Sequence, residues 1–270
     1  MKKSDRIGLS LLLSYLAAIR PRMKGRAEQI RGQYYAHRGL HNKKAGVPEN
    51  TMTAFCRAVE AGYGIELDVQ LTKDQEVVVF HDFDLKRICH VKGDVSDYTY
   101  EELQQFPICG TKERIPRFED VLKMVDGRVP LLVEIKYKEF GSRICPKADR
   151  YLQDYKGPYV MESFHPLALL WYRLHRPEIA RGQLSMNFQR RETNYLPPHL
   201  LVRHLLLNFV GRPDFIAYDI RDRGTVSRNI CRSFFGCPCA AWTVKSRTQL
   251  KEAKKGFDAF IFEGFMPKTY

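Results

Sequence analysis

The chain has 270 residues, of which 44% are hydrophobic, and a formal net charge of +13. This length and hydrophobic content allow a buried core, which excludes a wholly disordered protein. The charge favours an anionic partner: nucleic acid, a phosphate-bearing small molecule or an anionic membrane. The seven cysteines are scattered and none has C-x-x-C spacing, so we expect neither a disulfide framework nor a zinc site. Reduced thiols are typical of a cytoplasmic protein.

Residues 1–33 are the most basic part of the chain. Eight lysines and arginines against two acids give this segment a charge of +6, nearly half of the total. Its apolar run, residues 7–19, is shorter than the roughly 20 residues that a membrane-spanning helix needs. Leu9, Leu12 and Leu16 follow helical spacing. Two alternatives stay open: a basic amphipathic helix lying on anionic lipid, or a helix packed on the outside or bottom of the main domain.

From residue 34 onward, strand-like and helix-like segments alternate. Apolar runs predict strands at 34–36, 64–71, 77–81, 131–136, 159–163, 180–184, 215–219, 239–244 and 259–262. Helices are predicted at 51–60, 100–105, 118–125, 166–174, 226–234 and 247–255, with Asn50 capping the first and a Thr99–Glu102 capping box starting the second. Repeated β-then-α order predicts a parallel sheet, and about 250 residues is the usual size of an eight-unit barrel. The expected fold class is therefore α/β, a (β/α)8 TIM barrel over residues 34–270.

Two stretches depart from this regular order. Residues 82–117 are too long for a simple connection, so we expect a small insertion after the second barrel strand region, placed as a lid or a wall of the substrate site. Residues 186–213 contain an apolar run at 199–210. This run predicts either a helix packed on the barrel or a surface that faces lipid or a partner.

The stretch "YYAHRGL", residues 34–40, places His37 and Arg38 at the end of a short strand. A histidine in this place can be a core residue, a metal ligand or a proton shuttle. Glu66 and Asp68 in "GIELDVQLT" lie two residues apart on a predicted strand, so both carboxylates face one side. Two carboxylates inside a barrel are unfavourable unless they are solvated, hydrogen-bonded or bound to a cation.

Glu134 and Lys136 repeat this spacing in "LLVEIKY", and His81 ends the run "VVVFHDFD". Taken alone, each pair also fits an ion pair at the rim of a strand. Taken together, Glu66, Asp68 and Glu134 offer the oxygen ligands that Mg²⁺ or Ca²⁺ prefers. Because the carboxyl ends of parallel strands meet at the catalytic face of a barrel, we expect the histidines and carboxylates to share one site.

The motifs "HRG", "PENT", "IELDVQLTKD…VVVFHD" and "EIK", in this order, resemble those of the glycerophosphodiester phosphodiesterase family, of the TIM-barrel phosphodiesterases. "VMESFHPLALLWYRLHRPEIARGQL" and "AAWTV" also resemble family segments. The resemblance runs from about residue 34 to the C-terminus and is weakest after residue 185. It implies an acid–base pair of His37 and His81, phosphate contacts from Arg38 and Lys136, divalent-metal ligands Glu66, Asp68 and Glu134, and a substrate wall at Trp242.

The implied reaction is metal-dependent hydrolysis of a glycerophosphodiester to glycerol phosphate and an alcohol. One histidine would deprotonate the nucleophile and the other would protonate the leaving group. A divalent cation, Mg²⁺ or Ca²⁺, would neutralise the phosphodiester together with Arg38 and Lys136. Two points stay open: which histidine is the base, and whether the nucleophile is the substrate's own glycerol hydroxyl or a metal-held water.

Two other functions are weighed against this one. The first is lysophospholipase D-like hydrolysis of a membrane glycerophospholipid, which the basic segment 1–33 and the apolar run 199–210 favour. The second is non-catalytic binding of nucleic acid, which the concentration of charge in residues 1–33 and the lack of a known binding module oppose. We expect a cytoplasmic protein with a small-molecule substrate, peripheral at the inner membrane face if residues 1–33 bind anionic lipid.

One position departs from the family pattern. Family members commonly end the last strand in an I-x-T-D type sequence, whereas this chain has "FIFEGF", with Glu263 where an aspartate is usual. A longer carboxylate is expected to change a contact behind the site or the shape of the pocket rim. Residues 1–33 also lie outside the family pattern.

Overall fold

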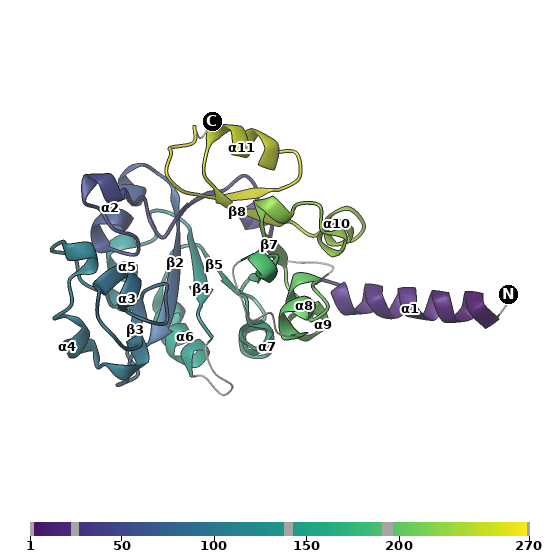
Figure 1. Cartoon of the computed structure of the whole chain (residues 1–270), viewed down its shortest axis with the longest axis horizontal. Coiled ribbons are helices and arrows are strands. Elements are labelled where there is room, and N and C mark those ends of the chain that lie inside the picture. The colour runs from purple at the N-terminus through teal and green to yellow at the C-terminus, as the bar shows by residue number, and fades with distance from the viewer. Residues whose placement is uncertain (1–2, 23–26, 138–142, 191–196, 269–270) are drawn as a thin grey trace.

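The sheet closes on itself, because its first strand pairs with both the second and the last. The computed structural model describes residues 3–22, 27–137, 143–190 and 197–268 (Figure 1). Eight parallel strands form the closed barrel: β1 (Tyr34–His37), β2 (Gly64–Leu71), β4 (Leu131–Ile135), β5 (Tyr159–Ser163), β6 (Arg181–Ser185), β7 (Phe215–Asp219), β8 (Cys239–Val244) and β9 (Ala259–Phe262). The predicted TIM barrel is confirmed.

A ninth strand, β3 (Val77–Val79), lies outside the closed barrel and runs antiparallel to β2. Its partner β2 is the longest strand, and the pairing of Val79 with Val69 folds the chain back along β2. The expectation that His81 follows a parallel strand was therefore wrong. The connection between β2 and β3 is too short for the crossover that a parallel pair needs, which is the physical reason for the reversal.

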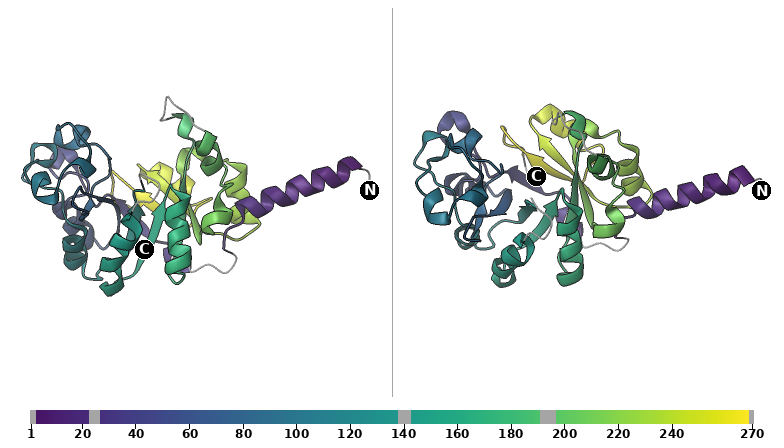
Figure 2. Two further views of the ribbon diagram at one scale, coloured as in Figure 1. Left: turned by 90° about the horizontal axis from the view of Figure 1, so that it is seen from below. Right: turned by 60° about the horizontal axis from the view of Figure 1, so that its bottom comes forward.

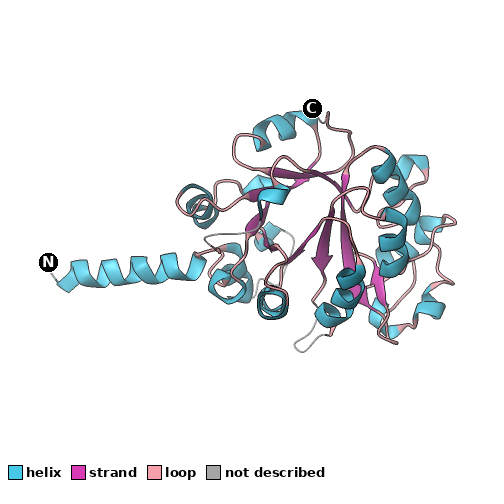
Figure 3. Ribbon diagram, turned by 180° about the vertical axis from the view of Figure 1, so that it is seen from behind, coloured by secondary structure: helices cyan, strands magenta, loops and turns pink. Residues whose placement is uncertain are grey.

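Most of the helices lie around the barrel strands, and the first projects away from them (Figure 3). They are α1 (Lys3–Ile19), α2 (Met52–Glu60), α3 (Lys86–Cys89), α4 (Tyr100–Leu103), α5 (Phe118–Val125), α6 (Ile144–Asp154), α7 (Pro166–His175), α8 (Pro197–Arg203), α9 (Asn208–Gly211), α10 (Val226–Ser233) and α11 (Arg247–Ala253). The capping box of Thr99 and Glu102 is confirmed. The expectation that Asn50 caps α2 was wrong, because Thr51 accepts the hydrogen bond from the Ala54 amide.

The core has three parts. The largest lies between the barrel and its helices and includes Leu67, Val133 and Tyr218. A second fills the barrel interior, to which alternate strand residues such as Leu132 and Ala217 point. The third belongs to residues 78–115, where α3 and α4 bury their own apolar side chains. The stretch expected to be an insertion thus brings its own small core.

The described residues 3–22 and 27–30 form a projecting helix and a turn that closes the end of the barrel. Helix α1 extends away from the barrel with the N-terminus at its far end (Figures 1 and 2). Its last turns alone pack on the main core, where Ile19 is fully buried and Tyr15 and Leu16 are half-buried. A 3-10 turn, Ala27–Ile30, inserts two apolar side chains into the cluster inside the barrel beside Tyr35. The expected packing of this segment on the main domain therefore holds for residues 27–30 and the last turns of α1, whereas most of α1 has no contact with the barrel.

The apolar run at 199–210 forms two short helices rather than one. Helix α8 ends at Arg203 and α9 begins at Asn208, and Leu205 between them has a positive φ of 57°. Val202 and Leu205 are buried, whereas Leu200, Leu201 and Phe209 are exposed. Among the helices that the structure describes, none combines the length and the hydrophobicity needed to cross a membrane.

Candidate active site

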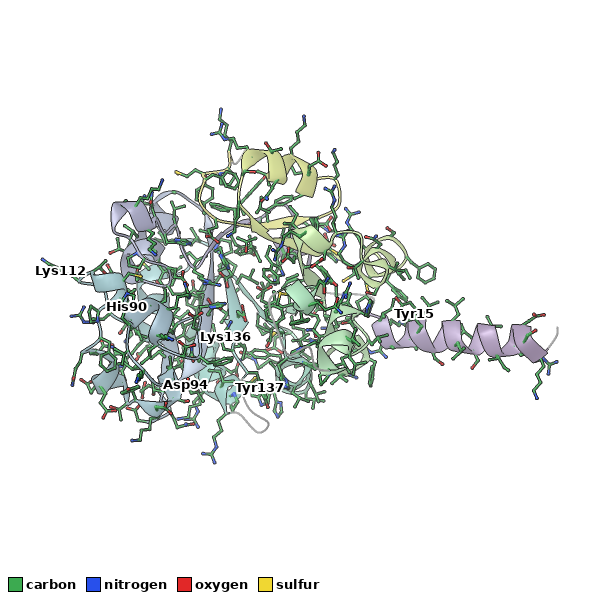
Figure 4. The ribbon with its side chains drawn as sticks, viewed as in Figure 1. Tyr15, His90, Asp94, Lys112, Lys136 and Tyr137 are labelled. Carbon is green, nitrogen blue, oxygen red and sulfur yellow. The ribbon has the colours of Figure 1, made fainter. Side chains whose placement is uncertain are left out.

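A cavity of about 240 Å³ opens at the carboxyl ends of the barrel strands. It is lined by six of the eight predicted site residues: His37, Arg38, Glu66, His81, Glu134 and Trp242. The other two, Asp68 and Lys136, lie directly behind the lining, where the Lys136 ammonium is 3.3 Å from Asp68 and 2.9 Å from Glu134. Figure 4 labels Lys136 just beyond the end of β4. The structure thus brings all eight residues into one site.

His37 ends β1 and is held by a carboxylate from the end of the barrel. Its Nδ1 lies 3.0 Å from Glu263 Oε2, just after β9. Burial, with the charge of Arg38, lowers the pKa of His37 to about 4, so the ring is neutral at physiological pH. The neutral ring donates its Nδ1 proton to Glu263, which leaves the Nε2 lone pair as a base. The hydrogen bond from His37 lowers the pKa of Glu263 to about 2.

The turn after β1 directs Arg38 back over the carboxylates. Arg38 has a positive φ of 56° and donates its backbone amide to Glu66, 2.8 Å away. Its guanidinium reaches Glu49 at 2.5 Å and lies 3.6 Å from Asp68. Gly39 is required next, because its φ is +80° and a Cβ would come within 2.9 Å of the Ala54 backbone. The "HRG" motif is thus a sharp turn that fits only with glycine in its third position.

The "PENT" motif supports the same turn from the other side. Asn50 is buried and donates from its side chain to Asp68 at 2.9 Å. Its backbone amide donates to the Arg38 carbonyl at 2.9 Å. Glu49 contacts both Arg38 and Arg87. The motif therefore fixes the orientation of one carboxylate and one guanidinium, a role that the sequence analysis did not assign to it.

Four carboxylates gather at the mouth of the barrel. Ligand oxygens of Glu66, Asp68 and Glu134 lie within 4.8 Å of one another, and all three side chains are buried. Register explains the grouping, because Asp68 pairs with Glu134 across β2 and β4. Glu134 pairs in turn with Glu162 on β5, a buried carboxylate that lines the cavity and that sequence analysis missed. Its signal was a glutamate near the end of a predicted strand, in "VMES".

The charges of this group favour a divalent cation. Four carboxylates face two half-buried cations, Arg38 and Lys136, so the group would hold two negative charges in excess with all four carboxylates ionised. Burial raises the pKa of Glu66 and of Glu162 well above the ordinary range, and raises that of Glu134 as well. Like charges at this spacing repel unless a cation or protons neutralise them. An all-oxygen donor set fits Mg²⁺ or Ca²⁺ better than zinc.

His81 reaches the cavity because β2 extends past the other strands and β3 returns along it. The amide of Phe80 donates to the Asp68 carbonyl, so His81 follows at the level of the carboxylates. Its Nδ1 lies 2.5 Å from Asp82, which Arg87 also contacts. His37 and His81 therefore each have a carboxylate at Nδ1. Asp82 was not predicted, although it stands next to His81 in "FHDFD".

The opposite wall of the cavity is apolar. Trp242 on β8 packs edge-on against Phe164, with ring centroids 5.6 Å apart, and both line the cavity. Leu184 and Ile261 complete this wall. Trp242, the residue expected to form a substrate wall, thus lines the cavity together with three apolar residues that sequence analysis did not select.

Comparison with known proteins is consistent with this geometry. The model of the glycerophosphoryl diester phosphodiesterase family matches residues 37–261. The Bacillus subtilis protein YhdW is 44% identical over 244 residues, covering 84% of this chain and 92% of that protein. A rat (Rattus norvegicus) lysophospholipase D is 41% identical over 164 residues, covering 56% of this chain and 49% of that protein.

A solved structure agrees in fold. The Oleispira antarctica phosphodiesterase, determined in complex with the product sn-glycerol-3-phosphate, superposes with a TM-score of 0.69 at 24% identity. The superposition covers 88% of this chain and 94% of that one. The resemblance inferred from the motifs is confirmed: the chain belongs to the glycerophosphoryl diester phosphodiesterase family and is a phosphoric diester hydrolase.

Proposed function

We propose that the chain hydrolyses small glycerophosphodiesters to glycerol phosphate and an alcohol, with a divalent cation and two histidines. The observation that carries the proposal is that His37 and His81 line one cavity together with members of the carboxylate cluster. The product named for the Oleispira antarctica structure supports a glycerol phosphate leaving this kind of site. Glu66, Asp68 and Glu134 would hold the cation, with Glu162 beside them.

The residues of the chain divide the work of the reaction. The bound cation would supply positive charge that polarises the phosphoryl oxygens. Arg38 lies at the cavity surface and can hold the anionic diester, while Lys136 offsets the charge of the carboxylates behind it. His37 is neutral, so we assign it as the base that deprotonates the attacking hydroxyl. His81, steadied by Asp82, is then the acid that protonates the departing alkoxide.

Lysophospholipase D-like hydrolysis is the second candidate. The apolar wall of Phe164, Leu184, Trp242 and Ile261 favours it, because such a wall can contact an acyl chain as well as a small alcohol. The rat relative carries that activity in its name, although this chain spans about half of its length. A membrane-bound substrate would also bring the enzyme to a lipid surface.

We also propose a cytoplasmic protein that binds the inner face of a membrane through its N-terminal segment. Projecting helix α1 supports this, since Leu9, Leu12 and Leu13 are each about half exposed to solvent. Lys3 and Arg6 lie at the start of the helix, and Arg20 follows its end, so basic residues flank the apolar part as they do in a helix on anionic lipid. Because residues 27–30 pack inside the end of the barrel, we assign the membrane contact to α1.

Removal of divalent cations should abolish hydrolysis. Exhaustive chelation should lower turnover of glycerophosphocholine at least 100-fold, and Mg²⁺ or Ca²⁺ should restore it, because the excess negative charge otherwise faces an anionic substrate. The same cation should raise the melting temperature of the wild type, and less so that of Glu134→Gln. Full turnover in the chelated protein would exclude the metal assignment.

His37 should titrate near pH 4 in the folded protein, well below the ordinary histidine value of about 6.5. Its neutral form, the base, therefore persists down to about pH 4. The Glu263 carboxylate stabilises the protonated ring, so Glu263→Gln should lower the His37 pKa further. NMR titration of the ring resonances, assigned with the His37→Asn variant, measures both values. A midpoint at or above 6.5 would contradict this account of the site.

His37→Ala and His81→Ala should each lower turnover at least about 100-fold, since a positioned proton transfer contributes roughly 10²–10⁴-fold. Both side chains line a cavity rather than the core, so melting temperatures should change little. His175→Ala, which removes an exposed histidine on α7, is the matched control and should keep wild-type turnover. A near-normal rate in either site variant would give that histidine a structural role.

A substrate panel separates the two candidate activities. Glycerophosphocholine, glycerophosphoethanolamine and glycerophosphoglycerol should be hydrolysed faster than a lysophospholipid; the reverse order would favour the lysophospholipase D reaction. Trp242→Ala should change the relative rates at which these substrates are hydrolysed, with a smaller effect on the rate for any single substrate. If the substrate's own glycerol hydroxyl attacks the phosphorus, the first product is a cyclic phosphate. The panel therefore includes a diester that lacks this hydroxyl, and its hydrolysis at an equal rate would exclude an obligatory cyclic phosphate.

A further inference from the structure

Five arginines surround a second cavity, of about 480 Å³, at the root of α1. We call this group the arginine cluster: Arg20 and Arg22 after α1, Arg173 on α7, Arg181 at the start of β6 and Arg212 after α9. They come from segments far apart in the sequence and meet at the amino ends of β6 and β7. The cluster therefore lies at the end of the barrel opposite the active site.

Positive charge exceeds negative charge in this cluster. Asp214 lies 3.6 Å from Arg22 and 3.5 Å from Arg181. Arg173 donates instead to the backbone carbonyls of Phe209 and Val210. Among the residues that the structure describes, one carboxylate, Asp214, thus pairs with this cluster of five guanidinium groups, an arrangement that an added anion would stabilise.

The buried member of the cluster has a donor without a hydrogen bond. The Arg181 side chain is only 3% exposed, and its Nη1, which lies 3.5 Å from Asp214 Oδ2 in an ion pair, makes no hydrogen bond in the described structure. Burial and the neighbouring arginine charges lower the pKa of Arg181 against the pull of Asp214, and lower that of Arg212 as well. Guanidinium groups match phosphate oxygens in geometry and charge, so phosphate is the anion that this cluster fits best.

Exposed apolar side chains lie next to the cluster. Leu174, which follows Arg173 on α7, is 65% exposed, and Phe209, whose carbonyl Arg173 contacts, is 50% exposed. Helix α1, which projects from the barrel (Figure 1) and leads directly into Arg20, exposes Leu9, Leu11, Leu12 and Leu13. Figure 4 labels Tyr15, near the point where this helix meets the barrel. A phosphate site beside exposed apolar groups matches the boundary between lipid headgroups and acyl chains better than it matches free phosphate.

We propose that the arginine cluster binds the phosphate groups of anionic phospholipids while α1 lies in the membrane interface. This proposal rests on the membrane position proposed above for α1, and it adds the site that would bind the lipid phosphates. Since the cluster and the active site lie at opposite ends of the strands, the docked barrel keeps its cavity away from the lipid it binds. The substrate then reaches the cavity from water, as a small glycerophosphodiester does.

The test compares full-length variants for co-sedimentation with phosphatidylcholine vesicles, with and without phosphatidylglycerol. Arg20→Gln/Arg173→Gln removes two charges at exposed positions of the cluster. Arg150→Gln/Arg223→Gln removes two charges at exposed positions elsewhere and is the matched control. One basic residue at such a surface contributes about 1 kcal/mol, or about fivefold, so the cluster variant should bind phosphatidylglycerol vesicles roughly 30-fold more weakly. Both variants should hydrolyse glycerophosphocholine at the wild-type rate.

Every other result of this experiment contradicts a specific part of the proposal. Equal weakening in the two variants means that net charge alone drives binding, which overturns the cluster site and leaves the membrane position intact. A wild-type chain that ignores phosphatidylglycerol vesicles at low salt overturns both. Calorimetric binding of inorganic phosphate without vesicle binding would make the cluster a site for a soluble anion. Self-association without vesicle binding, seen by sedimentation velocity, would make a second copy of the chain the partner of α1.

Discussion

Repulsion among buried carboxylates is the constraint on which the rest of the active site depends. Glu66, Asp68, Glu134 and Glu162 converge because parallel strands in register bring their carboxyl ends together. Such a group is tolerated only where donors and cations surround it. The left-handed turn at Arg38 supplies one such donor, its backbone amide, to Glu66, and the buried side-chain amide of Asn50 donates to Asp68. The "HRG" and "PENT" motifs, two of those that resemble the family in sequence, thus both stabilise the same negative charge in the structure.

Proton-transfer groups are placed around this centre by two different parts of the chain. His37 is held from the last strand through Glu263, and His81 is held from its own hairpin through Asp82. A carboxylate behind Nδ1 fixes the ring and leaves Nε2 for proton transfer. Glu263 is the position where the sequence departs from the family pattern, and its longer side chain still reaches the histidine.

Sequence reasoning recovered the barrel and most strand limits, because buried parallel strands are continuous apolar runs that end in polar residues. It missed α6, whose sequence "ICPKADRYLQD" is largely polar and contains a proline. It placed His81 in the cavity on the expectation that a parallel strand precedes this residue. That strand, β3, is antiparallel to β2, as the short connection between them already indicated. The arginine cluster has no signal in the sequence, because Arg20 and Arg212 are brought together only by folding.

The cavity has two halves with separate origins. The charged half comes from β1 to β5 with Glu263, whereas the apolar half is formed by Phe164, Leu184, Trp242 and Ile261, which pack with the cluster inside the barrel. Substitutions in the apolar half can change which alcohol fits without moving a carboxylate or a histidine. Selectivity and reactivity can therefore diverge independently in evolution, and one catalytic framework can serve diesters with different head groups.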